Sequence, residues 1–355
     1  MSNTALSSAA LNSSDSQRIK NIQSAIRQKD ADLKNQFSIF QHQDALGLFF
    51  CLLALVGMIA TGAAYIADII PAWLAIIVSC FFASISHEIE HDLIHRLYFR
   101  KNKFMHNLMM LLVWIMRPNT VNPWYRRGIH FNHHKVSGTA DDIEERVLGN
   151  GMQFGLKRLL ISLDGFLSIF LRFFELKNMK DYSFFKFVIK GSPMALTFVV
   201  GLYGFFLFHA YDFVAAQYGF FSAYPQWFVS IIEVLNIVAV VWLLPNFLRA
   251  LCLHNITAVM HYYGDVDSLL KQCQVMNHWA LLPIHALCMN FGATHTLHHF
   301  VVSQPFYLRQ LTAKSVYPVM KKNGVRFNDF ASLVRSNRFT KTQSKVNTNL
   351  EAKAI

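Results

Sequence analysis

Two long stretches of the chain are largely apolar and contain no basic residue. Lys and Arg are absent from residues 35–95 and again from residues 191–248, and each stretch can hold two spans of about 20 residues. Turn-forming positions divide the stretches, at "TGAAYIADIIP" (61–71) and at "HAYDFVAAQYGFFSAYPQ" (209–226). The pattern predicts four membrane-crossing helices, at about 47–69, 71–88, 193–211 and 227–249.

The basic residues indicate how these spans are oriented. All 33 Lys and Arg residues lie outside the two stretches, and the segments that flank each stretch are rich in them. The positive-inside rule places both turns outside the cytoplasm and the rest of the chain inside. We therefore predict an all-α integral membrane protein with two helical hairpins and a helical cytoplasmic cap. The expected location is multi-pass in a bacterial inner membrane, with both termini cytoplasmic.

Composition supports a membrane protein. Hydrophobic residues make up 53% of the chain and charged residues only 15%, against about 25% charged residues in soluble domains. The net charge is +12, but it comes from the segments around the spans, so no nucleic-acid partner is predicted.

The segment before the first span is polar, with apolar residues at helical spacing. Residues 15–38 carry Ile19, Ile22, Ile26, Leu33 and Phe37 among charged positions. Such a helix lies on the membrane surface or packs on the protein's own cytoplasmic part, and the sequence favours neither. At the other end, residues 340–355 are predicted to form a disordered tail.

The cysteines predict neither a disulfide framework nor a thiolate metal site. No CxxC pair occurs, and most cysteines lie in apolar runs, which is typical of buried packing residues. The five are Cys51, Cys80, Cys252, Cys273 and Cys288.

Eight of the 16 histidines form three tight clusters. "HEIEH" contains His87 and His91, "HFNHH" contains His130, His133 and His134, and "HTLHH" contains His295, His298 and His299. Residues i and i+3 or i+4 share one face of a helix, so two imidazoles in such a pair can bind one metal ion. Nitrogen ligands without cysteine suit iron, zinc or copper rather than magnesium or calcium. The predicted topology puts all three clusters on the cytoplasmic side.

Other histidines are weaker candidates. The fourth span runs into "RALCLHNITAVMHYYGD" (249–265), where His254 and His261 lie on one helical face about two turns apart. His95 extends the first cluster by four residues. We expect it to hold a neighbouring ligand in place rather than to bind the metal itself. His106, His209, His278 and His285 are predicted not to bind metal.

HxxxH followed by two HxxHH boxes and two apolar hairpins resembles the membrane fatty acid desaturase family, to which the membrane alkane hydroxylases are related. The resemblance implies an O2-dependent non-haem di-iron centre with iron ligands His87, His91, His130, His133, His134, His295, His298 and His299. His261 in "MHYYG" resembles a ninth family ligand. Some relatives have Asn where this chain has Thr257, which leaves open whether His254 or water completes the site.

The box spacings favour the desaturase branch. The first box has three intervening residues, as in acyl-lipid desaturases and alkane hydroxylases, and the second has two, as in desaturases. A bacterial desaturase-like group that forms terminal alkenes also fits. The resemblance divides the chain into a cytoplasmic N-terminal amphipathic segment (1–44), a membrane catalytic domain (45–310) and a cytoplasmic C-terminal segment (311–355).

Carboxylates accompany the boxes. Glu88 lies within the first box, Asp92 directly follows it, and Asp142 follows the second box. Ligating histidines usually donate their second N–H to such a group, so we predict that these three accept hydrogen bonds from ligand imidazoles. The alternative is that they are solvated or form surface ion pairs.

The resemblance predicts an enzyme that oxidises a fatty acyl chain taken from the membrane, most directly a desaturase. Hydroxylation and oxidative decarboxylation of free fatty acids to terminal alkenes are alternatives, and a non-enzymatic metal-binding protein is a distant one. The chain has no HPGG haem motif, GxGxxG fingerprint or cysteine cluster. We therefore predict a separate electron donor of ferredoxin, rubredoxin or cytochrome type. O2 is the other predicted reactant.

Overall fold

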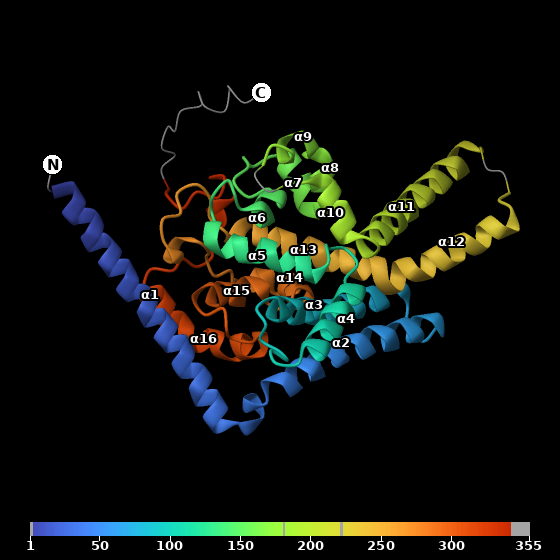
Figure 1. Ribbon diagram of the computed structural model, residues 1–355. Coiled ribbons are helices and arrows are strands. Elements are labelled where there is room, and N and C mark those ends of the chain that lie inside the picture. Colours follow the sequence, from blue (N-terminus) through green and yellow to red (C-terminus); the bar gives the residue numbers. More distant parts are fainter. Residues whose placement is uncertain (1–2, 180–181, 221–222, 342–355) are drawn as a thin grey trace.

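The computed structural model describes residues 3–179, 182–220 and 223–341 (Figure 1). In this part of the chain the only β-structure is two isolated bridges, His261 to Cys273 and Val275 to Phe327. The all-α prediction is thus confirmed. The α-helices are α1 (Asn3–Gln36), α2 (Gln43–Ile66), α3 (Ala72–Ile94), α4 (Lys103–Met116), α5 (Pro123–Val136), α6 (Ile143–Val147), α7 (Leu156–Leu163), α8 (Gly165–Leu171), α9 (Phe173–Leu176), α10 (Phe184–Gly191), α11 (Met194–Tyr218), α12 (Gln226–Val238), α13 (Leu244–Met260), α14 (Leu282–Leu287), α15 (Phe291–Phe300) and α16 (Phe306–Lys322).

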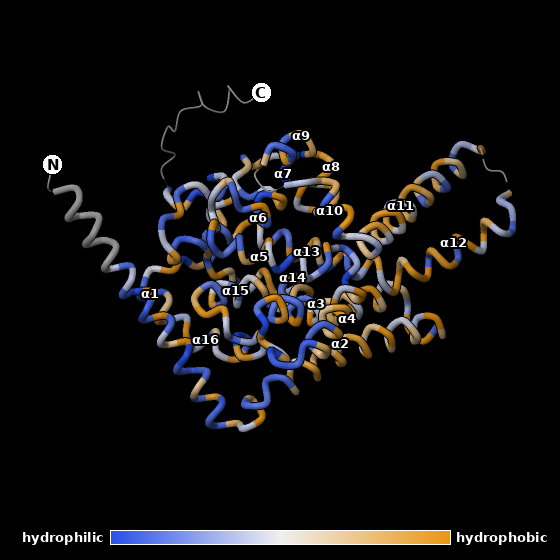
Figure 2. The backbone as a smooth tube through the Cα atoms, in the orientation of Figure 1, coloured by the Kyte–Doolittle hydropathy of each residue, from blue (hydrophilic) through white to orange (hydrophobic). Residues whose placement is uncertain are grey.

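Four helical stretches of the described chain are long and apolar enough to cross a membrane. They are α2, α3, α11 and the continuous run Gln226–Met260, which contains α12 and α13. This confirms the prediction of four spans. Figure 2 shows α2, α11 and α12 as mostly hydrophobic helices that extend to one side of the molecule. Their pairing as hairpins in a bilayer, and a cytoplasmic cap, stay predictions.

The two predicted turns are wrong in extent. α2 continues to Ile66, so the first turn shrinks to residues 67–71. The single Gly62 in "TGAAYI" costs only about 1 kcal/mol relative to Ala, and Pro71 comes after the helix. α11 continues to Tyr218 and ends at Gly219, whose φ of +70° is the left-handed conformation that glycine adopts at helix ends.

The fourth span is longer than predicted. The helix continues past residue 249 to Met260, with a π-helical segment at Ala239–Leu243 just before Pro245. Proline has no N–H to donate, so regular α-helical pairing is interrupted there. This extension carries His254 and places His261 directly after the helix.

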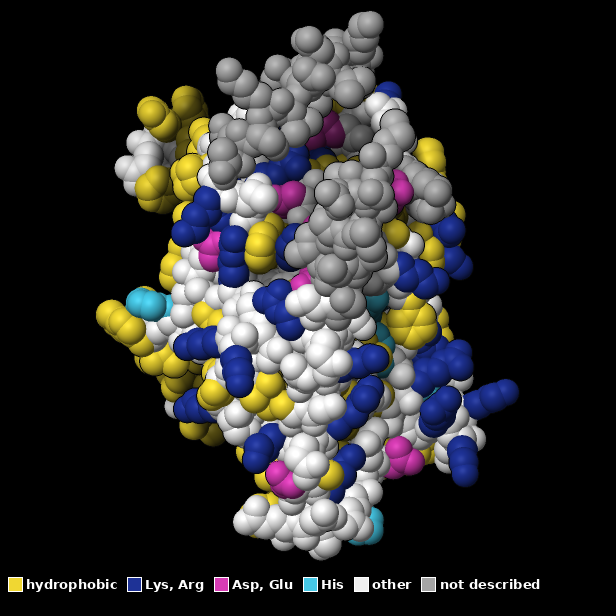
Figure 3. All heavy atoms as spheres, turned by 90° about the vertical axis from the view of Figure 1, so that its left-hand side faces the viewer, with side chains coloured by type: hydrophobic (Ala, Val, Ile, Leu, Met, Phe, Trp, Pro, Cys, Tyr) yellow, Lys and Arg dark blue, Asp and Glu magenta, His cyan; other side chains and the backbone are white. Residues whose placement is uncertain are grey.

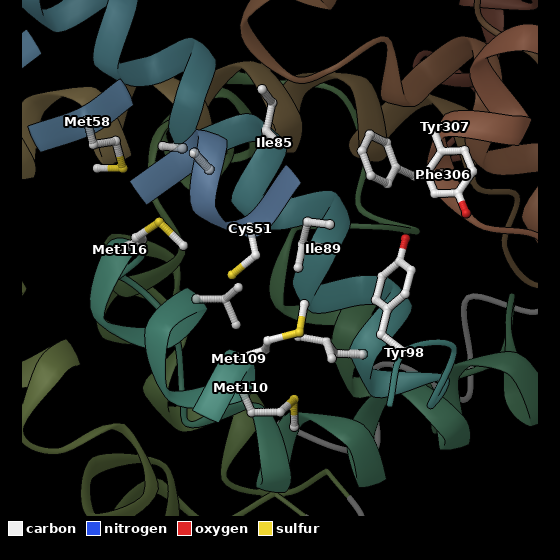
Figure 4. Packing of buried hydrophobic residues seen from close by; sticks show 14 of the residues in the cluster. Cys51, Met58, Ile85, Ile89, Tyr98, Met109, Met110, Met116, Phe306 and Tyr307 are labelled. Atoms are coloured by element: carbon white, nitrogen blue, oxygen red, sulfur yellow. The ribbon is translucent and has the colours of Figure 1, made fainter. Parts of the chain in front are cut away.

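α3 passes from an exposed apolar helix into the core, and every residue from Ala83 to Ile94 is buried. α2 and α4 pack around it with Cys51, Met109 and Met110 (Figure 4). Phe306 and Tyr307 of α16 join the same cluster. The end of α3 that carries the first histidine box is therefore held in the protein interior.

α1 packs on the protein itself. Ile22 and Ile26 are fully buried and lie in one cluster with Val316 and Met320 of α16. The Gln304 amide also donates to Asp30 of α1, with Nε2 and Oδ1 2.6 Å apart. Of the two alternatives for this helix, the structure shows packing against the protein.

Two smaller predictions concern the cysteines and the tail. All five cysteines are buried and unpaired, which confirms their prediction as packing residues. Residues 342–355 of the tail predicted at 340–355 lie outside the described residues.

Candidate metal centre

The ends of three helices and one loop bring the histidine boxes together. The first box lies in the last two turns of α3, the second in α5 and the third in α15, while His261 follows α13. Their side chains converge in two sets of four that could each hold a metal ion. We call His91, His95, His130 and His298 the first histidine group. The second histidine group is His133, His261, His295 and His299.

Ring nitrogens of the first histidine group lie close together. Within each group the possible ligand atoms are all within 4.8 Å of one another. His130 Nε2 is 3.0 Å from His95 Nε2. His134 Nε2 lies 3.2 Å from His130 Nε2 and 3.0 Å from His298 Nε2, so His134 adjoins this group.

The second histidine group is fully buried. His299 Nε2 lies 3.1 Å from His295 Nε2. The rings of His133 and His261 also contact each other, with centroids 5.2 Å apart. Three segments far apart in sequence thus contribute to this group.

The geometry fits metal ions. Two nitrogens that bind one ion at about 2.0–2.1 Å stand about 3 Å apart, which matches the separations in both groups. His261 Nε2 and both ring nitrogens of His91 are buried without a hydrogen-bond partner in the described structure. Buried polar atoms are normally paired, so these unpaired nitrogens fit a role as metal ligands.

Oxygen acceptors orient several of these rings. The partner of His130 Nδ1 is Glu144 Oε2 at 2.8 Å, and that of His133 Nδ1 is Asp142 Oδ2 at 2.9 Å. The partner of His299 Nδ1 is Gln272 Oε1 at 3.0 Å. A donated Nδ1–H leaves Nε2 free to bind a metal.

Burial and the neighbouring carboxylates shift the pKa values of these rings in opposite directions. Burial lowers the pKa of His95 and His134 to about 2 and that of His261 to about 3, so these rings are neutral. Burial also lowers the pKa of His133, but the carboxylates of Asp142, Glu144 and Glu145 together raise it to about 10. A metal ion would have to displace that proton, after which the carboxylates offset its charge.

A family model covers most of this architecture. The Fatty acid desaturase model matches residues 67–331, a range that contains every histidine of the two groups. The chain belongs to the fatty acid desaturase family. The family implies an oxidoreductase, and with the four apolar spans it makes this a membrane protein. A comparison with curated proteins gives no match.

Besides His134, which adjoins the first histidine group, three residues predicted as ligands or possible ligands of this desaturase-family protein lie outside both groups. His87 is buried beside Phe291, with ring centroids 5.7 Å apart. His254 lines a cavity next to the site. Thr257 is buried and contributes its backbone carbonyl, 3.4 Å from His261 Nδ1. His95, by contrast, belongs to the first histidine group. The sequence had predicted only a supporting role for it.

Glu88 and Asp92, at the first box, form ion pairs with an arginine. Glu88 Oε2 accepts from Arg309 Nη2 at 2.8 Å, and Asp92 Oδ1 from Arg309 Nη1 at 3.2 Å. Asp92 also accepts from the Tyr98 hydroxyl at 2.8 Å. Both carboxylates thus join α3 to α16, while the closest imidazole nitrogens, those of His87 and His91, are 3.8 Å away.

Sequence reasoning missed three residues of this site. Glu144 stands in the acidic run after the second box, so its position was a usable signal. The positions of Gln272 and Arg309 gave no such signal. Each lies outside the boxes in sequence and comes close to the site only when the chain is folded.

Asp142 provides a direct test of ring orientation. Its side chain is 1% exposed and accepts from His133, whereas the neighbouring Asp141 is exposed. We expect Asp142→Asn to lower metal affinity about 10–100-fold, because the neutral amide holds His133 less firmly and no longer offsets the metal's charge. Titration of metal-depleted protein with Fe²⁺ measures this. Asp141→Asn is the matched control, and equal affinities in the two variants would contradict the assignment.

Proposed function

We propose that this protein is an O2-dependent di-iron oxidoreductase that desaturates a fatty acyl chain. The observation that carries the proposal is the convergence of two four-histidine groups in a member of the fatty acid desaturase family. All-nitrogen ligand sets suit iron. Two iron ions would supply the oxidising power that O2 chemistry needs at an unactivated C–H bond.

The protein's own residues hold and orient the site. His91, His95, His130 and His298, adjoined by His134, would bind one ion, and the second histidine group would bind the other. Asp142, Glu144 and Gln272 fix three of the rings, which keeps the ligand nitrogens in place during turnover. The last part of α3 is buried throughout, which keeps bulk water away from the histidines of the first box.

The reaction requires electrons from outside the chain. Desaturation removes two hydrogens from adjacent carbons, and one O2 becomes two waters with two further electrons and two protons. We propose a separate ferredoxin-, rubredoxin- or cytochrome-type donor. Figure 3 shows many Lys and Arg side chains on the face that carries α1, and such a face attracts an acidic donor. Docking that is insensitive to salt would contradict this.

We also propose that the histidine end of the protein faces the cytoplasm of a bacterial inner membrane. The support is the absence of basic residues from the two apolar stretches and their abundance around them. On this orientation, lipid reaches the site from the bilayer, and protons and electrons reach it from the cytosol.

Product analysis tests the proposal. Detergent-purified protein, loaded with Fe²⁺ and given a reductase, an electron donor and O2, is expected to convert a fatty acyl substrate to an alkenoyl product. Mass spectrometry separates this from a hydroxylated chain, and from a terminal alkene one carbon shorter, which would replace desaturation by decarboxylation. Bound iron without O2 consumption on any fatty acyl compound would sink the enzyme proposal.

A further inference from the structure

A pocket of ≈ 210 Å³ lies where α4 begins, beside the loop that follows α3. Four of its lining residues are cationic, none is acidic, and no ion pair joins any of the four to a described residue. Like charges that gather without a counter-ion repel one another, so the pocket favours an anionic ligand. We call it the cationic pocket, and its lining is Arg96, Phe99, Arg100, Lys103, His106, Asn107 and Arg127.

Arg127 is held firmly in this pocket. Its Nε donates to the Ile94 carbonyl and its Nη2 to the Leu93 carbonyl, both at 3.0 Å. Nη2 also lies 2.7 Å from His106 Nε2, while His106 Nδ1 lies 3.0 Å from the Tyr98 carbonyl. The buried imidazole therefore donates through Nδ1 and accepts from the arginine through Nε2. The Nη1 group of Arg127 makes no hydrogen bond with a described residue, so it is available to a ligand.

Two neighbouring groups also suit an anion. Asn107 Oδ1 accepts from Trp124 Nε1 at 2.9 Å, which leaves the amide NH2 group of Asn107 as a donor. Burial lowers the pKa of Arg127, and the positive charge of Arg96 lowers it further. The two guanidinium groups are therefore close enough to repel each other, and an anion in the pocket would offset that repulsion.

The cationic pocket lies at the level where the membrane spans end. The Gln43 amide, at the start of α2, donates to the Leu97 carbonyl at 2.7 Å. Asp44 Oδ1 accepts from the Phe99 backbone N–H at 2.7 Å. Since α2 and α3 are long and apolar enough to cross a membrane, the loop that joins their ends lies beside the lipid headgroups.

An exposed apolar strip continues from the cationic pocket along α4. Phe104 directly follows Lys103 and is 74% exposed. Leu108, Leu111 and Ile115 are exposed too, and their spacing of three or four residues places them on the face of Phe104. α4 packs against α2 and α3 (Figure 1). The strip therefore flanks the spans, where acyl chains of the bilayer lie.

We propose that the cationic pocket binds the phosphate headgroup of an anionic glycerophospholipid whose acyl chains lie along α4. Guanidinium groups match phosphate oxygens in geometry, and hydrogen bonds between charged partners are stronger than neutral ones. A free phosphate would satisfy the cations alone, whereas a lipid also covers the apolar strip that starts at Phe104. This lipid site is separate from the candidate metal centre and does not depend on the reaction proposed there.

Native mass spectrometry of the detergent-purified full chain tests this. Phosphatidylglycerol and phosphatidylcholine with the same acyl chains are compared, because the second carries a cation of its own. We expect wild type to bind phosphatidylglycerol about tenfold or more tightly. Arg100→Gln should weaken that binding about fivefold, the usual contribution of one cation facing an anionic lipid. The matched control is Lys101→Gln, since Lys101 is exposed like Arg100 but does not line the pocket.

Two further variants separate binding from folding. Lys103 is exposed, so Lys103→Gln should weaken phosphatidylglycerol binding as Arg100→Gln does, without a change in unfolding temperature. Arg127→Gln should remove the preference for phosphatidylglycerol altogether. Because it also removes bonds to the carbonyls of α3, its unfolding temperature without lipid is measured beside wild type. Added phosphatidylglycerol should raise the unfolding temperature of wild type and of Lys101→Gln more than that of Arg100→Gln.

Several results would overturn the proposal. Equal affinity of wild type for the two lipids would do so, as would equal losses in Arg100→Gln and Lys101→Gln. Displacement of phosphatidylglycerol by an equal concentration of inorganic phosphate would assign the pocket to a free anion. Weaker binding of an acidic electron donor by Arg100→Gln, with phosphatidylglycerol binding intact, would assign these cations to the donor protein instead.

Discussion

Replacing His299 by alanine is expected to abolish turnover and to lower the iron content from about two ions per chain to about one. His299 Nε2 stands 3.1 Å from His295 Nε2 in the second histidine group, so its loss opens one of two neighbouring sites. Because O2 chemistry would need both ions, we expect activity to fall at least about 100-fold. Iron analysis by mass spectrometry and product formation on the same samples measure the two effects.

Controls for this prediction come from other histidines. His278→Ala should keep iron and activity, because His278 caps a short helical turn and belongs to neither group. His298→Ala should lose the other ion. His87→Ala removes a ligand implied by the resemblance, and His95→Ala removes a member of the first histidine group. We expect the larger loss of iron in His95→Ala. Full iron content in His299→Ala would contradict a second metal site.

Arg309→Ala is expected to destabilise the protein by about 3–5 kcal/mol, the usual cost of leaving buried charges without their partner. Arg309 is 2% exposed and donates to Glu88, to Asp92 and to the backbone carbonyl of Gln304. Without it, two carboxylates of the first box remain buried and uncompensated. Since α3 then loses its ion pairs to α16, iron should be lost together with stability. Thermal unfolding in detergent and iron content measure both losses.

Two further variants separate charge from packing at this position. Arg309→Lys keeps the charge but cannot reach both carboxylates as a planar guanidinium does. We therefore expect its losses of stability and of iron to lie between those of wild type and Arg309→Ala. Lys314→Ala, on the exposed face of the same helix, should change stability by less than about 0.5 kcal/mol. Unfolding of Arg309→Ala at the wild-type temperature would show that Glu88 and Asp92 do not need the arginine.

Some properties of this protein are fixed by local sequence alone. The four spans follow from runs of apolar residues without Lys or Arg, because a bilayer selects helices by length and hydrophobicity, whatever they later pack against. The histidine boxes are equally local, since i, i+3 and i+4 spacing places imidazoles on one helical face before any tertiary contact forms. Asp142 could be proposed as a partner of the boxes because it follows the second box closely in sequence.

Only the tertiary structure decided how the boxes combine. Each histidine group takes members from at least three separate segments, and His95 and His261 acquire neighbours only through packing of α3, α5, α13 and α15. Spacing along one helix carries no information about which rings of another helix lie opposite. For the same reason, Arg309 and Gln272 gave no signal in the sequence. The contacts of α1 with α16 were needed to show that this helix packs against the protein.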